Sequence, residues 1–79
     1  MKLLFFAQLK DAIGRGEVHW TDAGKLNADQ LWERLEREFP GLTTHRVSVR
    51  LARNGVYAKA DELFEPTDEV ALIPPVSGG

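Results

Sequence analysis

The chain has 79 residues, which is enough for one domain near the lower size limit for a core that is stable without metals or disulfides. It has no cysteine, which excludes thiolate nucleophiles, disulfides and cysteine-ligated zinc or iron–sulfur centres and fits a cytoplasmic protein. Ten Lys and Arg against twelve Asp and Glu give a formal net charge of −2, which argues against binding nucleic-acid backbones. The apolar start Met1–Ala7 is broken at Gln8, so we expect neither a signal peptide nor a membrane span.

Two strands are predicted at the start of the chain. Residues Leu3–Leu9 are apolar on both faces near their start, which is typical of a central strand. The glycine-containing stretch Lys10–Gly16 is predicted to be a turn, and Glu17–Thr21 a second strand with Val18 and Trp20 on one face.

The clearest helix signal begins at Asn27. Asn27 and Gln30 have the spacing of a capping box, and Pro40-Gly41 predicts that the helix ends at Phe39. One helical face is apolar and must pack on something apolar. It carries Ala28, Leu31, Trp32, Leu35 and Phe39.

The second half of the chain predicts three more strands. Val47–Arg53 alternates in polarity, and Asn54-Gly55 is the strongest hairpin signal in the chain, leading into Val56–Ala58. The short apolar run Val70–Ile73 is predicted to be a buried strand. The order β, β, α, β, β, β predicts a two-layer α+β fold over residues 1–79, with one mixed sheet and one main helix packed on one face.

The chain ends in a distinctive segment. Pro74 and Pro75 cannot donate backbone hydrogen bonds, so they are expected to stop the last strand and stiffen its exit. Residues 76–79 are small, and we expect a flexible tail that can enter a narrow channel with the Gly79 carboxylate at its tip. A frayed terminus without function is the alternative.

The side chains offer no catalytic constellation. His19 and His45 have no partners at the spacing of a metal site, and Gly14-Arg15-Gly16 lacks the third glycine and following helix of a phosphate loop. Trp20 and Trp32 are predicted to lie in the core. Four acidic residues are expected on a solvated loop face, with a basic partner as the alternative: Asp61, Glu62, Asp68 and Glu69.

An apolar surface patch is the more informative feature. If Leu3, Phe5, Leu9 and Leu72 face the helix, strand alternation turns other apolar side chains to the opposite side of the sheet. No remaining sequence could cover them, so a partner site is predicted there. These side chains are Leu4, Phe6 and Ile73, joined by Tyr57 through the hairpin.

Both ends of the chain resemble a known family. Residues 4–9 (Leu-Phe-Phe-Ala-Gln-Leu) and 68–79, which end in Pro-Pro-Val-Ser-Gly-Gly, resemble the small subunits of molybdopterin synthase (the MoaD family). Asn54 also matches an asparagine of that family, whereas the middle from Ala23 to Ser48 carries little of its pattern. The resemblance implies a ubiquitin-like β-grasp fold and contacts of Phe6, Tyr57 and Ile73 with the large subunit.

The resemblance also implies a sulfur-carrier mechanism. An E1-like adenylyltransferase would use ATP to adenylate the Gly79 carboxylate, and a sulfur donor system such as a cysteine desulfurase would convert it to a thiocarboxylate. The tail Pro75, Val76, Ser77 and Gly78 would then enter the large subunit, where sulfur passes to cyclic pyranopterin monophosphate. The catalytic side chains are expected on the large subunit, with no cofactor, metal, membrane or nucleic acid bound permanently by this chain.

Other functions stay open at this point. The chain could be a sulfur carrier for thiamin or tRNA thiolation, or a ubiquitin-like modifier joined to lysines, since a terminal Gly-Gly is common to such proteins. A second alternative, from a different class, is a β-grasp interaction module whose tail has no role.

Overall fold

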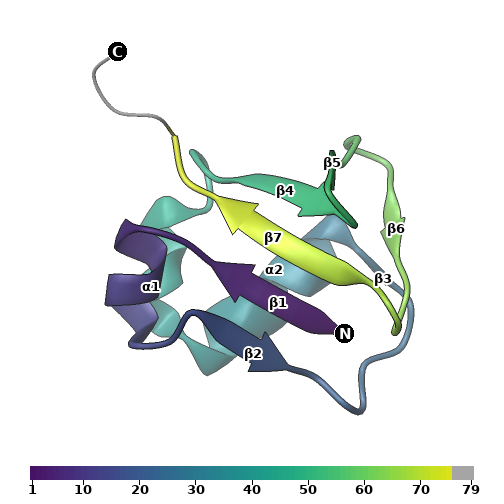
Figure 1. Ribbon diagram of the computed structural model, residues 1–79, viewed down its shortest axis with the longest axis horizontal. Helices are drawn as coiled ribbons and strands as arrows, with labels where there is room; N and C mark the ends of the chain where they lie inside the picture. Colours follow the sequence, from purple (N-terminus) through teal and green to yellow (C-terminus); the bar gives the residue numbers. More distant parts are fainter. Residues whose placement is uncertain (76–79) are drawn as a thin grey trace.

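The computed structural model describes residues 1–75 and shows a twisted sheet with helices packed on one of its faces (Figure 1). The elements are β1 (Lys2–Phe5), α1 (Gln8–Ile13), β2 (Glu17–His19), β3 (Leu26–Asn27), α2 (Ala28–Glu38), η1 (Pro40–His45), β4 (Arg50–Arg53), β5 (Val56–Tyr57), β6 (Leu63–Phe64) and β7 (Glu69–Ile73). No helix in this part of the chain is long and apolar enough to cross a bilayer.

The main sheet has the strand order β2-β1-β7-β4-β5. Two of its three inner strands, β1 and β7, come from opposite ends of the sequence and run parallel, whereas the other neighbours are antiparallel. β3 and β6 form a separate two-stranded sheet. The predicted mixed sheet and the central place of the first strand are confirmed.

Helix α2 packs across the sheet as predicted. The Asn27 side chain accepts a hydrogen bond from the Gln30 N–H at 2.8 Å, and the Gln30 side chain accepts one from the Asn27 N–H at 2.9 Å. This capping box satisfies two backbone donors that the helix itself cannot satisfy. The buried residues of the helix are Leu31, Trp32 and Leu35, and Phe39 meets Phe5 edge to face.

The Asn54-Gly55 hairpin is also confirmed. Asn54 has φ 50° and Gly55 has φ 86°, the left-handed values that a two-residue turn of this kind requires. The turn joins β4 to β5 with Arg53 opposite Val56.

The first predicted strand is too long. The strand ends at Phe5, and α1 occupies the region predicted to be strand and turn. Ala7 adopts φ 49°, which turns the chain out of the sheet, and Gly14 ends α1 in the left-handed conformation. Leu9 and Ile13, four residues apart, pack one face of α1 against the core, so Leu9 is buried as predicted but on a helix.

The third predicted strand begins too early. The strand starts at Arg50, because η1 and a following turn occupy the residues before it. The backbone N–H groups of Ser48 and Val49 both donate to the His45 carbonyl, and the Val47 side chain is 95% exposed. The two-residue strands β3 and β6 were not predicted.

The core lies between the sheet and the helices. Leu3 and Phe5 of β1 and Val70 and Leu72 of β7 point into it and are almost completely buried. Trp20 and Trp32 are both core residues, as predicted. Strands β1 and β7 are therefore held by hydrogen bonds to their neighbours and by apolar packing on the helix side.

Candidate functional site

The face of the sheet opposite α2 has no helix over it in the described residues (Figure 1). Leu3 and Phe5 are buried on the helix side, so Leu4 faces the open side and is half-buried. Phe6 directly follows β1 and is 47% exposed, and Tyr57 of β5 is 53% exposed. The predicted exposure is confirmed for Phe6 and Tyr57, whereas Leu4 is only partly exposed.

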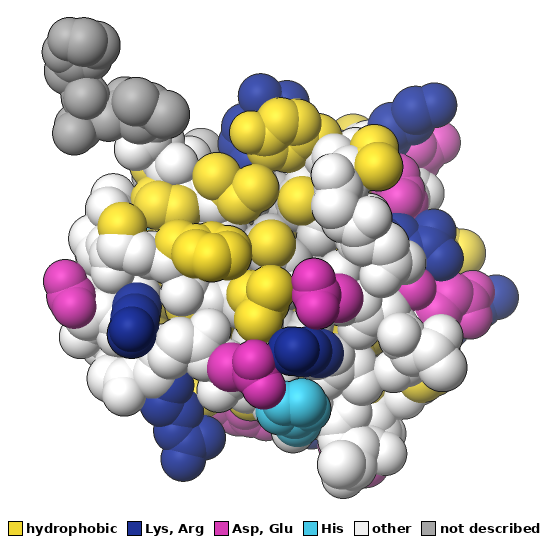
Figure 2. Space-filling view, viewed as in Figure 1, with side chains coloured by type: hydrophobic (Ala, Val, Ile, Leu, Met, Phe, Trp, Pro, Cys, Tyr) yellow, Lys and Arg dark blue, Asp and Glu magenta, His cyan; other side chains and the backbone are white. Residues whose placement is uncertain are grey.

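Together these side chains form an apolar patch, made up of Leu4, Phe6, Tyr57, Ala71 and Ile73. Phe5 is paired with Leu72 in the parallel register, so the next residues along the two strands are Phe6 and Ile73. Ala71 lies opposite Ala52, whose partner on the other side is Tyr57. Figure 2 shows apolar side chains gathered over β7 and its neighbouring strands. Contiguous exposed apolar surface of this kind marks interaction sites in soluble proteins.

A charged band borders the apolar patch on the same face. The Lys2 ammonium lies 3.5 Å from a Glu17 carboxylate oxygen and 3.7 Å from one of Glu69. His19 bonds the other oxygen of Glu17, and this hydrogen bond lowers the pKa of the Glu17 carboxyl below its ordinary value. The cation of this band is therefore already paired with two carboxylates of the same chain.

The chain leaves the sheet beside the apolar patch. β7 ends at Ile73, and the ladder of hydrogen bonds stops before Pro74 and Pro75, of which Pro75 is exposed. Because β7 is paired on both sides, the point of exit is fixed relative to Phe6 and Tyr57. Four of the predicted site residues, Val76, Ser77, Gly78 and Gly79, lie outside the described residues.

One acidic residue is placed differently from the prediction. Asp61 and Glu69 are exposed as expected, but Asp68 is 5% exposed and belongs to a polar cluster. Its carboxylate accepts hydrogen bonds from the Arg53 guanidinium, from Asn54 Nδ2 at 2.9 Å and from the Glu65 backbone N–H at 2.7 Å. The prediction of a solvated Asp68 is wrong, because partners 14 and 15 residues earlier in the chain enclose it.

The cluster sets the protonation of Asp68. Burial opposes ionisation of this carboxyl, but the hydrogen bonds from the Glu65 N–H, Asn54 and Arg53 outweigh it and lower its pKa below the ordinary value. The Asp68 carboxylate in turn raises the pKa of Arg53. Asp68 is therefore a charged, fully bonded group at the start of β7, with a structural rather than a catalytic environment.

The described residues contain no group of three or more His, Asp and Glu side chains placed to hold a metal ion. His19 is paired with Glu17 on the surface, and His45 ends η1 with its carbonyl bonded to the following turn.

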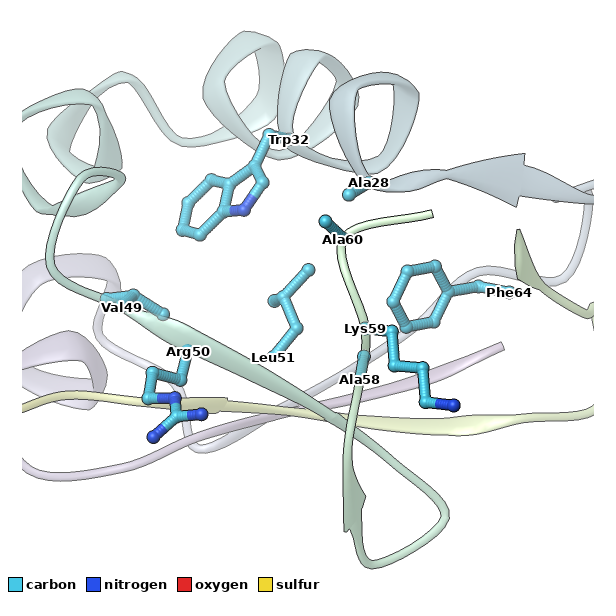
Figure 3. Close-up of a pocket in the computed structure, with 9 residues that line it drawn as sticks. All are labelled: Ala28, Trp32, Val49, Arg50, Leu51, Ala58, Lys59, Ala60 and Phe64. Atoms are coloured by element: carbon cyan, nitrogen blue, oxygen red, sulfur yellow. The ribbon is translucent and has the colours of Figure 1, made fainter. Parts of the chain in front are cut away.

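A cavity of about 310 Å³ lies on the helix side of the sheet (Figure 3). Its walls include Trp32, Leu51, Phe64 and Ala60, and the Arg50 side chain leaves β4 on the side away from Trp32. Most of the lining side chains are apolar, Lys59 and Arg50 are its charged residues, and no carboxylate or histidine lines it. The sheet separates this cavity from the apolar patch.

Comparisons with known proteins give consistent results. A family model described as the ThiS family matches residues 3–79. The molybdopterin synthase sulfur carrier subunit of Homo sapiens is 33% identical over 82 residues, which cover 100% of this chain and 93% of that protein. The protein of the same name from Mycobacterium tuberculosis is 34% identical over 85 residues, covering 100% and 96%.

Among solved structures, SAMP1 from Haloferax volcanii is similar with a TM-score of 0.81 and 30% identity, covering 99% of this chain and 97% of that one. This similarity over nearly the whole of both chains confirms the β-grasp fold.

Proposed function

This chain belongs to the ThiS family, and on that premise we propose that it is a sulfur carrier of molybdenum cofactor biosynthesis, the small subunit of a molybdopterin synthase. The observation that carries the proposal is the position of the exit from β7. The chain leaves the sheet at Ile73, within the exposed apolar patch that also contains Phe6 and Tyr57.

The proposed partner is the large subunit of the synthase. Docking of the apolar patch on the large subunit would place residues 76–79 in its active site. Fixing each tail residue costs on the order of 1–2 kcal/mol in backbone entropy, and the apolar contact offsets this cost by making entry intramolecular. We propose that the large subunit supplies the catalytic side chains, since residues 1–75 of this chain bring no catalytic side chains together.

The proposed chemistry takes place at the Gly79 carboxylate. A carboxylate is a poor electrophile, because nucleophilic attack would add charge to an anion. An E1-like adenylyltransferase would join it to the AMP part of ATP with release of pyrophosphate. The terminal sulfur of a persulfide donor, such as a cysteine desulfurase system, would then displace AMP to form an acyl disulfide. A thiol would reduce the S–S bond of this intermediate, leaving a thiocarboxylate on the chain and a disulfide on the donor. The sulfur of the thiocarboxylate would pass to cyclic pyranopterin monophosphate in the large subunit. We propose that these steps take place in the cytoplasm, where ATP is available.

The first experiment is an intact-mass measurement of the chain. The purified protein is incubated with the E1-like enzyme of its host, ATP and a sulfur donor, with a reaction lacking ATP as control. Exchange of one oxygen for sulfur, mapped to Gly79, is the expected result. An unchanged mass with an enzyme that is active on another carrier would overturn the carrier function.

A second function is favoured by the likeness to SAMP1, whose full name in a related structure is small archaeal modifier protein 1. A protein modifier would use the same activated Gly79 to form an isopeptide bond with a lysine of another protein. Adducts of this chain on lysines, found by peptide mass spectrometry of host cells, would support that function over sulfur transfer. A carrier for thiamin synthesis or tRNA thiolation would differ in the molecule that accepts the sulfur. A deletion strain that loses only thiamin or only thiolated tRNA would identify such a carrier.

A further inference from the structure

Arg50 stands within the surface that we propose for docking. It is the first residue of β4 and the register partner of Ile73, the last residue of β7. Its guanidinium carbon lies 4.3 Å from the centroid of the Tyr57 ring. Figure 3 shows its side chain leaving β4 on the side opposite to Leu51 and Trp32. Arg50 is therefore held over one member of the apolar patch and beside another.

The charge of Arg50 has no carboxylate partner in residues 1–75, where every ion pair within 4.0 Å involves other cations. Three other arginines differ from Arg50 in that each pairs with two carboxylates: Arg34, Arg46 and Arg53. On the same face, Lys2 is already shared by Glu17 and Glu69. The open face thus combines a lysine that is paired with two carboxylates and an arginine that is stacked on Tyr57 and has no carboxylate partner in residues 1–75.

A partner that covers the apolar patch also removes water from the Arg50 guanidinium, so it must supply a hydrogen-bond acceptor in place of that water. Removing water from a guanidinium without giving it an acceptor is strongly unfavourable, and stacking on Tyr57 offsets only part of that cost. A carboxylate matches the planar fork of arginine with two parallel hydrogen bonds. Stacking on Tyr57 also restricts the side chain before binding, which reduces the entropy lost when it is engaged.

We infer that Arg50, held over Tyr57, binds a carboxylate of an Asp or Glu side chain on the large subunit and so helps to determine which partner the carrier accepts. The inference rests on the proposed function, because it takes the large subunit as the molecule that covers the apolar patch. It adds a requirement that apolar contact alone does not impose. A surface with matching apolar shape but no acidic group opposite Arg50 is rejected, because it leaves a desolvated charge unpaired.

The test is a titration of the purified large subunit, from the same host, with the wild-type chain and with R50Q, R50K and R50E by calorimetry. R37E is the matched control, since Arg37 is an exposed arginine of α2, in the layer on the other side of the sheet, and makes no ion pair in residues 1–75. We expect R50Q to raise Kd roughly thirty-fold or more, as for truncation of one member of a buried charge pair, and R50E to raise it further. R50K should retain part of the affinity, and R37E should bind like wild type. Urea midpoints of all variants establish that each one is folded.

Two outcomes separate this inference from the proposed function. If the wild-type chain does not bind the large subunit, the proposed function fails. If the wild type binds and R50Q and R50E bind equally well, the function stands and the inference is wrong.

A second set of titrations identifies where the carboxylate comes from. The titrations with wild type and R50E are repeated with chains that lack Gly78 and Gly79. The reason is that the terminal carboxylate of the chain itself is the other group that could bind Arg50. The same loss of affinity from R50E in the shortened chain supports a carboxylate of the partner. Disappearance of the loss would assign Arg50 to the chain's own terminus and overturn the inference.

Discussion

Asn54 Nδ2 donates a hydrogen bond of 2.9 Å to the Asp68 carboxylate, and Asn54 Oδ1 accepts one of 2.9 Å from the Glu69 backbone N–H. The two contacts tie the turn of the β4–β5 hairpin to the first residues of β7. A third bond, from the Asn54 N–H to the Glu69 carbonyl at 2.8 Å, completes the junction. The side chain of a turn residue thus holds the start of the strand from which the chain leaves the sheet.

Asp68→Ala is expected to destabilise the protein by about 1–3 kcal/mol, because it leaves the Arg53 guanidinium, the Asn54 amide and the Glu65 N–H without their shared acceptor. Urea unfolding followed by the fluorescence of Trp20 and Trp32 measures the change. Asp61→Ala is the control, since Asp61 is an exposed acidic residue of the preceding loop, between β5 and β6. Equal unfolding midpoints for the two variants would contradict the role given to Asp68.

The contribution of Asp68 should also depend on pH. Its pKa is lowered in the folded protein, so its stabilising effect is fully present above the ordinary carboxyl pKa of about 4 and is lost as pH falls through the lower folded value. The difference in unfolding free energy between wild type and Asp68→Ala should therefore shrink between about pH 5 and pH 2. A difference that stayed constant over this range would show that Asp68 acts without its charge.

Gly55→Ala is expected to cost about 1–2 kcal/mol through backbone conformation alone. Gly55 has φ 86°, and a Cβ added there would meet nothing within 4 Å, so no steric clash with neighbours contributes. Gly24 is equally open but has no positive φ, which makes Gly24→Ala the matched control. Thermal unfolding of both variants should show a lower Tm for Gly55→Ala only. A similar loss in both would contradict the role given to the positive φ of Gly55, because the unfolded-state effect of replacing glycine by alanine is stabilising.

Phe6→Asp is expected to weaken binding to the large subunit by roughly ten- to a hundred-fold, since it places a charge where apolar surface is to be buried. Leu63→Asp is the control, because Leu63 is also 47% exposed but lies on β6 of the small sheet. Calorimetry with the large subunit gives the affinities. The rate of adenylation by the E1-like enzyme, measured by pyrophosphate release, should be unchanged in Phe6→Asp. Equal loss of both reactions would show that the two partners use the same patch.

Removal of Gly79 is expected to abolish sulfur transfer and leave the unfolding midpoint unchanged, because the described core ends at β7. Conversion of cyclic pyranopterin monophosphate by the reconstituted synthase gives the activity. Val47→Ala is the control: Val47 is 95% exposed, so this variant should keep wild-type sulfur transfer. Retained sulfur transfer without Gly79 would rule out the proposed chemistry.

The elements that were predicted correctly have strong local signals. Asn27 and Gln30 lie three residues apart and bond each other, so their geometry is set within one helical turn. Asn54-Gly55 requires left-handed backbone at two successive residues, which few other residue pairs favour. In both cases the determining contacts lie close together in the sequence.

The elements that were missed depend on contacts that are distant in sequence or on very short patterns. Six apolar residues from Leu3 to Leu9 fit an extended strand, and only the left-handed turn at Ala7 shows that the chain leaves the sheet. The spacing of Leu9 and Ile13 followed by Gly14 was an available signal for a short helix with a glycine C-cap. β3 and β6 have two residues each, which is too short for any period to appear.

The apolar part of the candidate site was predictable, whereas its polar part was not. Strand alternation was enough to place Leu4 and Ile73 on the open face. The environments of Arg50 and Asp68 depend on which strands are neighbours and in which register. Only the paired sheet shows that one of these charges is stacked on Tyr57 and the other enclosed beside Asn54.

The parallel pairing of β1 with β7 has a consequence for synthesis of the protein. The sheet cannot close until residues 69–73 have left the ribosome, because β7 separates β1 from β4 and bonds both of them. A nascent chain that stops short of β7 loses the middle of its sheet, not merely its end, and exposes its core to proteolysis.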